Sequence, residues 1–296
     1  MNAINAMTER MKIIELEQGS QEWLSWRKTV ITATDCSCIL GNNPWTTAYK
    51  CWQRKLGLIE EQASSAAMER GKALEPEARA QFIERYGLNM IPVVVESAEF
   101  DFLGASLDGI SDDGRALLEI KCGGTKLHQM ALNQEIPQYY LDQIQHQLLV
   151  TGAERCFYYS YDGTNGICIE VLPNPEFKAT FMPKAREFWK CVAFNEPPPL
   201  QDSDYKDMSG EPQWKGFAGE YRKLCEQIKN LEDIKDSYRK ELLKLSGDQN
   251  CLGGGVRVMK TIMRGRVDYD AIPEIKGVDL DQYRKNSSST WKILIA

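Results

Sequence analysis

Two short apolar runs that carry acidic side chains constrain this chain more than any other feature. Leu107-Asp108-Gly109-Ile110 is followed by the turn signal Asp112-Asp113-Gly114 and then by Ala116-Leu117-Leu118-Glu119-Ile120-Lys121. This pattern predicts two strands joined as a hairpin. Because alternate side chains of a strand point to opposite faces, Glu119 and Lys121 share one face and Ile120 takes the other. Pairing of the two runs brings Asp108 within reach of the face that holds Glu119.

The charged residues of these runs admit two interpretations. Acid-turn-acid patterns followed by a lysine are common, and an exposed hairpin with a surface ion pair produces the same pattern. However, Asp108 and Glu119 lie among strand-forming apolar residues, where a buried charge is costly unless it is paired or binds a metal. Two carboxylates with no other obvious role form an oxygen-lined site for a hard cation such as Mg²⁺. Lys121 is then suited to hold a metal-bound water or the charge that develops on a phosphate.

Length and composition exclude several classes of protein. With 296 residues the chain can bury a large core, as one large domain or two smaller ones. It has no apolar run of about 18 residues and no N-terminal secretory pattern, so we expect neither a membrane span nor secretion. The nine scattered cysteines favour a reducing cytosol. The net charge of −6 argues against non-specific coating of nucleic acid but permits a local basic channel.

The first helices contain a candidate anion site. Gln21–Arg27 is predicted as a short helix with Ser20 as its N-cap, and Thr34 is a candidate cap for the helix that follows. Helix N-termini attract anions because their amide groups are free, so Arg27 and Thr34 are suited to hold a phosphate. The simpler alternative is a surface arginine beside a structural cap.

A longer helix is predicted over 66–86, ended by Gly87. Glu75 and Arg79 lie one turn apart on it, which is the spacing of a side-chain ion pair. Glu75 could instead point toward the metal site, but helix geometry alone favours the pair.

The remainder of the first two hundred residues alternates between strands and helices. Gln143 and Gln147 lie four residues apart on one predicted helix, with Tyr139 one turn before Gln143. Strands are predicted at 90–95, 103–110, 116–122, 155–161 and 166–172, and further helices at 46–56, 125–132, 137–151 and 176–194.

The character of the chain changes from about residue 200. The acidic, turn-rich stretch 200–212 is a candidate linker, and a 4-3 apolar spacing then runs from Phe217 to Leu245, broken once at Lys235. This spacing predicts a helix that packs against another helix or the core. Gly253-Gly254-Gly255 opens a predicted basic strand pair. Its side chains either contact a phosphate backbone and stack on a base or remain solvated; they are Arg257, Lys260, Arg264 and Arg266, with Tyr269 and Tyr283 nearby.

Several short motifs occur in one order along residues 15–195. They include Trp26-Arg27 before Val30-Ile31-Thr32-Ala33-Thr34, then Arg70-Gly71-Lys72 with Glu75, Ser106-Leu107-Asp108-Gly109, Leu118-Glu119-Ile120-Lys121-Cys122 and Tyr140-Leu141-Asp142-Gln143-Ile144-Gln145. Together they resemble the lambda-exonuclease or YqaJ-type family of phage recombination nucleases. The agreement of order and spacing makes the resemblance specific, since any one motif alone would be weak.

The resemblance implies an α/β (α+β) fold with a restriction-endonuclease-like core of the PD-(D/E)XK type, in which helices flank a central mixed sheet. After this core we expect a C-terminal helix and a small β extension. The expected organisation is a loose leader at residues 1–10, the nuclease core at 11–199 and a C-terminal extension at 200–296.

The family also implies an activity, a cofactor and partners. The activity is Mg²⁺-dependent 5′-to-3′ digestion of one strand of linear double-stranded DNA from a 5′-phosphorylated end, which leaves a 3′ overhang. Two Mg²⁺ ions per active site are expected, with Mn²⁺ as a plausible substitute. The expected partners are the ends of the duplex, two further copies in a homotrimer ring that encircles it, and a phage single-strand annealing protein in the cytoplasm of a bacterial host.

Carried over by motif, four residues would form the metal and water site. Asp108 and Glu119 would be metal ligands, joined by the backbone carbonyl oxygen of Ile120, and Lys121 would orient or activate the attacking water.

Five further residues are carried over around that site. Glu75 would complete the acidic site, which reverses the simple ion pair favoured by helix geometry, and Gln143 would reach the site from a later helix. Arg27, Thr34 and Ser106 match the family's pocket for the 5′-phosphate. Thr34 stands where a serine is usual, but the hydroxyl group is retained.

Three other functions remain open from the sequence. An endonuclease or junction resolvase on the same core would cleave closed circles, whereas a 5′-end exonuclease would not. A non-catalytic DNA-binding or scaffold protein does not require the full set of Asp108, Glu119 and Lys121. A metal-dependent phosphoesterase acting on small nucleotides would leave the basic tail without a role.

Overall fold

The computed structural model describes residues 10–60, 65–263, 265, 272–275, 278 and 283. The chain divides into two compact units, Met1–Tyr205 and Lys206–Ala296, and the division falls within the predicted linker 200–212. Residues 1–9 of the expected leader lie outside the described residues, as do Arg264, Arg266 and Tyr269 of the predicted basic tail.

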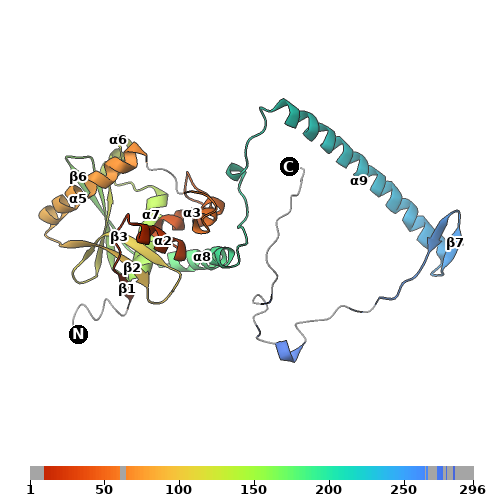
Figure 1. Ribbon diagram of the computed structural model, residues 1–296, viewed down its shortest axis with the longest axis horizontal. Coiled ribbons are helices and arrows are strands. Elements are labelled where there is room, and N and C mark those ends of the chain that lie inside the picture. Colours follow the sequence, from red (N-terminus) through yellow and green to blue (C-terminus); the bar gives the residue numbers. More distant parts are fainter. Residues whose placement is uncertain are drawn as a thin grey trace. The chain divides into compact units, whose positions relative to one another are not determined.

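A six-stranded mixed sheet forms the centre of the first unit (Figure 1). Neighbouring strands are antiparallel except for β4 and β5, which are parallel. A parallel pair requires a long crossover, and helices α6 and α7 provide it. In spatial order the strands are β1 (Met11–Ile14), β2 (Met90–Ser97), β3 (Gly104–Ser111), β4 (Ala116–Lys121), β5 (Arg155–Tyr161) and β6 (Gly166–Val171).

Helices cover both faces of this sheet. One face packs against α5, whose Ala78 and Phe82 join a buried cluster with Leu118, Ile120 and Tyr159. The opposite face packs against α7. The predicted core of a mixed sheet flanked by helices is therefore confirmed. The helices are α2 (Gln21–Thr29), α3 (Ala33–Leu40), α4 (Ala48–Lys55), α5 (Ala66–Tyr86), α6 (Thr125–Leu132), α7 (Gln138–Thr151) and α8 (Phe177–Ala193), followed by a 3₁₀ turn at Asp202–Asp204.

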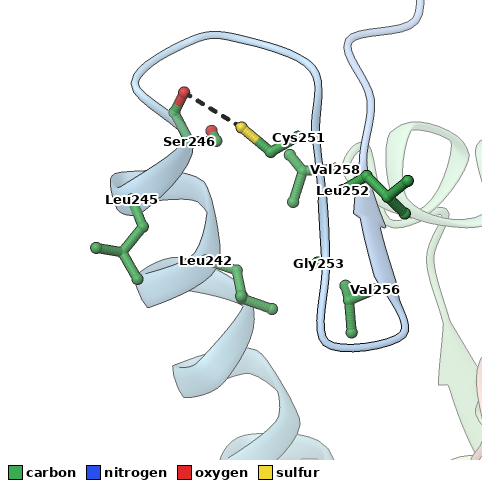
Figure 2. A pocket seen from close by; sticks show the side chains of 8 residues that line it. All are labelled: Leu242, Leu245, Ser246, Cys251, Leu252, Gly253, Val256 and Val258. Carbon is green, nitrogen blue, oxygen red and sulfur yellow. Dashed lines mark hydrogen bonds between the residues drawn. The ribbon is translucent and has the colours of Figure 1, made fainter.

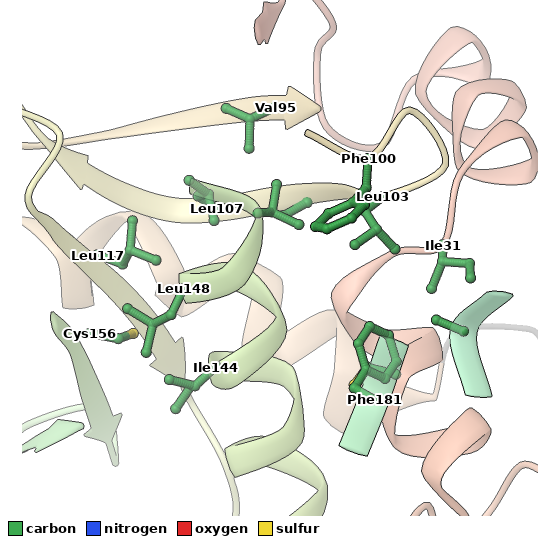
Figure 3. Packing of buried hydrophobic residues seen from close by; sticks show 14 of the residues in the cluster. Ile31, Val95, Phe100, Leu103, Leu107, Leu117, Ile144, Leu148, Cys156 and Phe181 are labelled. Carbon is green, nitrogen blue, oxygen red and sulfur yellow. The ribbon is translucent and has the colours of Figure 1, made fainter. Parts of the chain in front are cut away.

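Helix α7 is held on the sheet by apolar side chains. Ile144 and Leu148 point toward Leu117 of β4 and Cys156 of β5 (Figure 3), and Ile144 is completely buried. Burying a side chain of this size contributes about 1.5–3 kcal/mol. The same packing therefore fixes which face of α7 meets the end of β4.

The predicted helix ends are correct in two cases and wrong in one. Ser20 accepts a hydrogen bond from Trp23 N at the start of α2, and Gly87 ends α5 with a φ of 66°. The prediction that Thr34 caps the next helix is wrong: α3 begins at Ala33 and its N-cap is Thr32. The carboxylate of Asp35 accepts from Thr32 N at 2.8 Å. This contact places the N-cap two residues before Thr34.

The second unit contains the predicted C-terminal helix and small β extension. Helix α9 (Pro212–Ser246) is followed by the antiparallel strands β7 (Cys251–Gly253) and β8 (Val256–Val258), and a 3₁₀ turn lies at Pro273–Ile275. Gly254 and Gly255, both with positive φ, form the turn of this pair rather than its beginning. The hairpin lies beside the last turns of α9, where Leu242 faces it (Figure 2). Within the described residues, none of the helices has the length and apolar character needed to cross a membrane.

Candidate active site

The candidate site lies where β3 and β4 stop pairing. The two strands pair through Gly109 with Leu118 and Ile110 with Leu117. Beyond that point the backbone amide of Ile120 donates to Oδ2 of Asp108 at 2.7 Å. A side-chain carboxylate therefore takes the place of a strand carbonyl, and Asp108 lies against the end of β4, as its position on the predicted hairpin requires.

Glu119 is 1% exposed, yet both of its carboxylate oxygens have partners. Gln143 Nε2 donates to Oε1 at 2.7 Å and Gln147 Nε2 donates to Oε2 at 2.6 Å. Lys121 Nζ forms an ion pair with Oε1. A buried carboxylate is tolerated only with such partners. The two glutamines come from adjacent turns of α7, so the packing of that helix orients Glu119.

Lys121 remains a cation in this arrangement. Burial lowers the pKa of a lysine, but the carboxylates of Glu119 and Asp108 outweigh burial and raise the pKa of Lys121 above its usual value. Its Nζ also lies 4.8 Å from the centre of the Tyr140 ring. A protonated lysine here can stabilise negative charge and donate a hydrogen bond to a water molecule.

Glu75 forms an ion pair and also raises the pKa of Asp108. Its carboxylate pairs with Arg79 Nη2, as the helix spacing predicts, and Arg79 Nε donates to the backbone oxygen of Asp108 at 2.6 Å. Desolvation, Glu119 and Glu75 together raise the pKa of Asp108 well above its usual value, although Lys121 opposes the shift. Negative charge is therefore crowded at this end of the sheet.

The donor set suits Mg²⁺ in an open site. In the part of the chain that the structure describes, no group of three or more His, Cys, Asp and Glu side chains is close enough together to enclose a metal. Mg²⁺ does not require such a cage, because it commonly binds through one or two carboxylates and completes its shell with water and substrate phosphate oxygens. The crowding that raises the pKa of Asp108 is also what a divalent cation would relieve.

A second cluster joins the three residues that match a 5′-phosphate pocket. Arg27 Nη2 donates to Thr34 Oγ1 at 3.0 Å, and the Arg27 guanidinium lies 4.6 Å from the centre of the Trp23 ring. Trp23 Nε1 donates to Ser106 Oγ at 2.7 Å. Ser106 and Asp108 are two residues apart on β3, so the cluster adjoins the acidic site.

Lys55 holds the backbone and the carboxylate that lie next to this second cluster. Its ammonium group is buried and donates to Arg27 O at 2.6 Å, Val30 O at 2.5 Å and Asp35 Oδ2 at 2.5 Å. Although burial opposes it, the charges of Lys55 and Arg27 hold the pKa of Asp35 well below its usual range. The end of α2 and the start of α3 are therefore tied together by one lysine of α4.

Several residues of these clusters are missing from the predicted site, among them Trp23, Lys55 and Gln147. Gln147 could have been included, because it shares the face of α7 with Gln143. Lys55, at the end of a helix, and Trp23, within a helix, show no sequence pattern that would have predicted their place in the site. Their roles depend on contacts with segments that are distant in the sequence.

The fold and the geometry of the site define a restriction-endonuclease-like core. Residues 22–154 match the model of the YqaJ-like viral recombinase domain. The resemblance drawn from the motifs is confirmed. All the side chains of the two clusters lie within the matched residues.

Two known proteins show how far the similarity extends. The uncharacterized protein YqaJ of Bacillus subtilis (strain 168) is 28% identical over 192 residues, which cover 63% of this chain and 60% of the relative, so the match spans less than two thirds of that protein. The crystal structure of LHK-Exo, an alkaline exonuclease from Laribacter hongkongensis, superposes with a TM-score of 0.53 at 25% identity and covers 60% of this chain and 94% of that one. LHK-Exo in complex with dAMP gives the same values.

Proposed function

We propose that this protein is a Mg²⁺-dependent 5′-to-3′ exonuclease. It digests one strand of linear double-stranded DNA from a 5′-phosphorylated end and leaves a 3′ overhang for single-strand annealing recombination. The observation that carries the proposal is the adjacency of two clusters on β3. Asp108 joins Glu119 and Lys121, and Ser106 joins Arg27 and Thr34 through Trp23.

The similar enzyme LHK-Exo supports this assignment. It is an alkaline exonuclease with a related fold, and it has been crystallised with dAMP. A deoxynucleoside monophosphate is what the removal of one terminal nucleotide releases. The match to the family model, over residues 22–154, includes the whole candidate site of the present chain.

Asp108 and Glu119, with the carbonyl oxygen of Ile120, would hold Mg²⁺ or, in its place, Mn²⁺. Bound ions lower the pKa of water and neutralise charge on the transferring phosphate, and two ions per site would share these tasks. Gln143 and Gln147 would keep the Glu119 carboxylate oriented toward the ion. Lys121 would donate a hydrogen bond to the attacking water or to a phosphate oxygen. Glu75 adds negative charge to the site. Arg79 neutralises part of this charge through its ion pair with Glu75.

The second cluster would select the end of the strand. The Arg27 guanidinium presents several donors in a plane, a geometry suited to phosphate, and the hydroxyl groups of Thr34 and Ser106 add further donors. A terminal phosphate carries more charge than an internal phosphodiester. Two residues along a strand span about 6–7 Å, a distance on the scale of one nucleotide. A phosphate anchored here would present the next phosphodiester to Asp108.

The proposed assembly is a homotrimer that encircles the duplex and acts with a phage single-strand annealing protein. A ring with a basic lining reconciles the net charge of −6 with DNA binding. It would also keep the duplex threaded while mononucleotides depart. The similarity of residues 22–154 to the YqaJ-like recombinase family supports these proposed partners.

The decisive experiment digests linear duplexes that carry either a 5′-phosphate or a 5′-hydroxyl, with and without Mg²⁺. We expect rapid loss of the phosphorylated strand only when Mg²⁺ is present. Asp108→Ala should abolish digestion but retain DNA binding, and Arg27→Ala should reduce the preference for the phosphorylated end. Digestion that ignores both the end and the metal would refute the proposal. Cleavage of closed circles would instead indicate an endonuclease.

A further inference from the structure

Helix α9 carries a stripe of large apolar side chains with a repeat of seven residues. One set lies at Trp214, Tyr221, Ile228 and Leu242, with Lys235 as the single polar member of that series. The second set lies at Phe217, Leu224, Leu231, Tyr238 and Leu245. Alternating steps of three and four residues are the signature of helices that wrap around one another.

The stripe is exposed along its length. Phe217 is 77% exposed, Leu231 64% and Tyr238 68%. The β7–β8 hairpin faces only the last turns, where Leu242 is 40% exposed (Figure 2). A single helix cannot bury such a stripe against itself, and an apolar surface of this extent marks an interaction site.

We propose that α9 packs against the α9 of a second copy of this chain, as a parallel coiled coil in register. This pairing is separate from the proposed ring of three nuclease cores and joins subunits of different rings. The area is sufficient: nine side chains that each offer roughly 100 Å² on two helices bury about 1,800 Å², against the ~1,000 Å² that a specific interface needs. Ile228 in the first series and leucines in the second are a combination typical of parallel pairs.

The charges beside the stripe favour the parallel arrangement. In a parallel pair the flanking positions five residues apart face each other, so Glu220 faces Cys225 and Glu241 faces Ser246 of the other helix. None of the pairs formed in this way joins like charges. In an antiparallel pair of full length, Glu220 would face Glu241 at both ends. Lys235 sits opposite itself only when the parallel helices are in register, and a single polar residue of this kind defines the register.

The test uses disulfide capture in the full-length chain. In a background with Cys225→Ser and Cys251→Ser, which removes the two native thiols of the helix and hairpin, single cysteines are introduced as Leu224→Cys or Leu231→Cys. Lys229→Cys, on the opposite side of the helix, is the matched control. Under mild oxidation we expect at least tenfold more covalent dimer from each stripe variant than from the control. Dimer yields equal to the control would overturn the proposal, as would a disulfide formed only within one chain.

A second substitution separates association through α9 from association through the nuclease core. Adding Ile228→Glu to the Leu231→Cys variant should reduce covalent dimer to the control level, while adding Lys229→Glu should leave it unchanged. An unchanged yield with Ile228→Glu would count against the stripe. Because the readout is a covalent bond in α9, neither result depends on the proposed nuclease activity.

Discussion

Charged side chains are usually exposed and aromatic side chains are usually buried, but Glu119 and Phe217 do the opposite. Glu119 is a charge that is 1% exposed, and Phe217 is an aromatic ring that is 77% exposed. In the first unit, each buried charge of the candidate site is held by side chains from other elements. In α9, the apolar stripe has no such partners among the described residues of its own unit beyond the hairpin at its end.

The buried charges of the first unit and the exposed stripe of α9 favour different kinds of binding. A buried charged side chain that is held by several partners can interact strongly with a cation or a phosphate. An exposed apolar stripe stores free energy that is released on association. The contrast is consistent with the two proposals, a charged ligand for the first unit and a partner helix for the extension.

The largest expected effect comes from Asp108→Asn in the candidate site. Loss of a ligand should reduce digestion of linear duplex by more than about 100-fold, beyond the cost of losing an outer partner. Because the pKa of Asp108 is raised, its ionised form costs stability at any pH above the unfolded value. The variant should therefore melt at a higher temperature than the wild type at pH 7.5 without Mg²⁺, and Mg²⁺ should stabilise it less. A lower melting temperature would contradict this account.

Lys55→Met should be the most destabilising single change beneath the second cluster. It leaves the carboxylate of Asp35 buried without its partner, which costs about 3–5 kcal/mol. Asp35→Asn in the same chain should restore part of this loss. The matched change in the extension is Lys223→Met, which removes an exposed ion pair with Glu220 and should alter stability by less than about 0.5 kcal/mol. Urea unfolding measures all three, and equal losses in the two units would break the comparison.

Two isoleucines offer the same substitution in the two environments. Ile144 is completely buried under the sheet, and Ile228 is 56% exposed on α9. Ile144→Ala should reduce the free energy of unfolding of the first unit by about 2–5 kcal/mol, whereas Ile228→Ala should leave it almost unchanged. Unfolding is followed by tryptophan fluorescence. A comparable loss from Ile228→Ala would show that α9 contributes to the stability of the first unit.

His146 should make the first unit sensitive to mild acid. Burial lowers the pKa of this completely buried histidine to about 4, although its contact with Gly104 O opposes the shift. The unfolded chain takes up the proton near pH 6.5, so the stabilising contribution is complete above that pH and is lost as the pH falls toward 4. Between pH 6.5 and 5 the loss is about 2 kcal/mol. His146→Gln should flatten this dependence in urea unfolding, and an unchanged slope would rule out His146 as its source.

The smallest expected effect belongs to Gln147→Ala. It removes one of the two amide groups that orient Glu119, and loss of such an outer partner reduces metal affinity or activity by about 10-fold or somewhat more. Titration of Mg²⁺ against the variant separates weaker binding from slower chemistry. Gln145→Ala, on the same helix with its Nε2 bonded to Leu172 O, is the control and should retain wild-type affinity.

The local elements of the first unit were largely predictable. Helix α6 matches its predicted limits, and the predicted limits of β3, β4, β5 and β6 lie within one residue of those in the structure. Alternation and turn signals report local preferences, which burial in this fold reinforces. The start of α3 was mispredicted because Thr32 and Thr34 are both plausible caps, and only the Asp35 carboxylate distinguishes them.

The candidate site was predictable where a short motif carries it. Asp108, Glu119 and Lys121 lie within two adjacent runs, so a hairpin alone brings them together. Gln147, Trp23 and Lys55 act across the fold. Lys55 reaches Val30, 25 residues away, and Gln147 reaches Glu119, 28 residues away. No local pattern reports such contacts.

The amino-acid sequence by itself determined the order of the strands and helices after β1, the acid-acid-lysine hairpin and the seven-residue repeat of α9, because each depends on neighbours within a few residues. Only the tertiary structure decided that α7 supplies two amide groups to Glu119 and that Lys55 joins the two helices around Arg27. These contacts depend on which face of each helix the core buries. That choice is made by the packing of the whole unit rather than by any one segment.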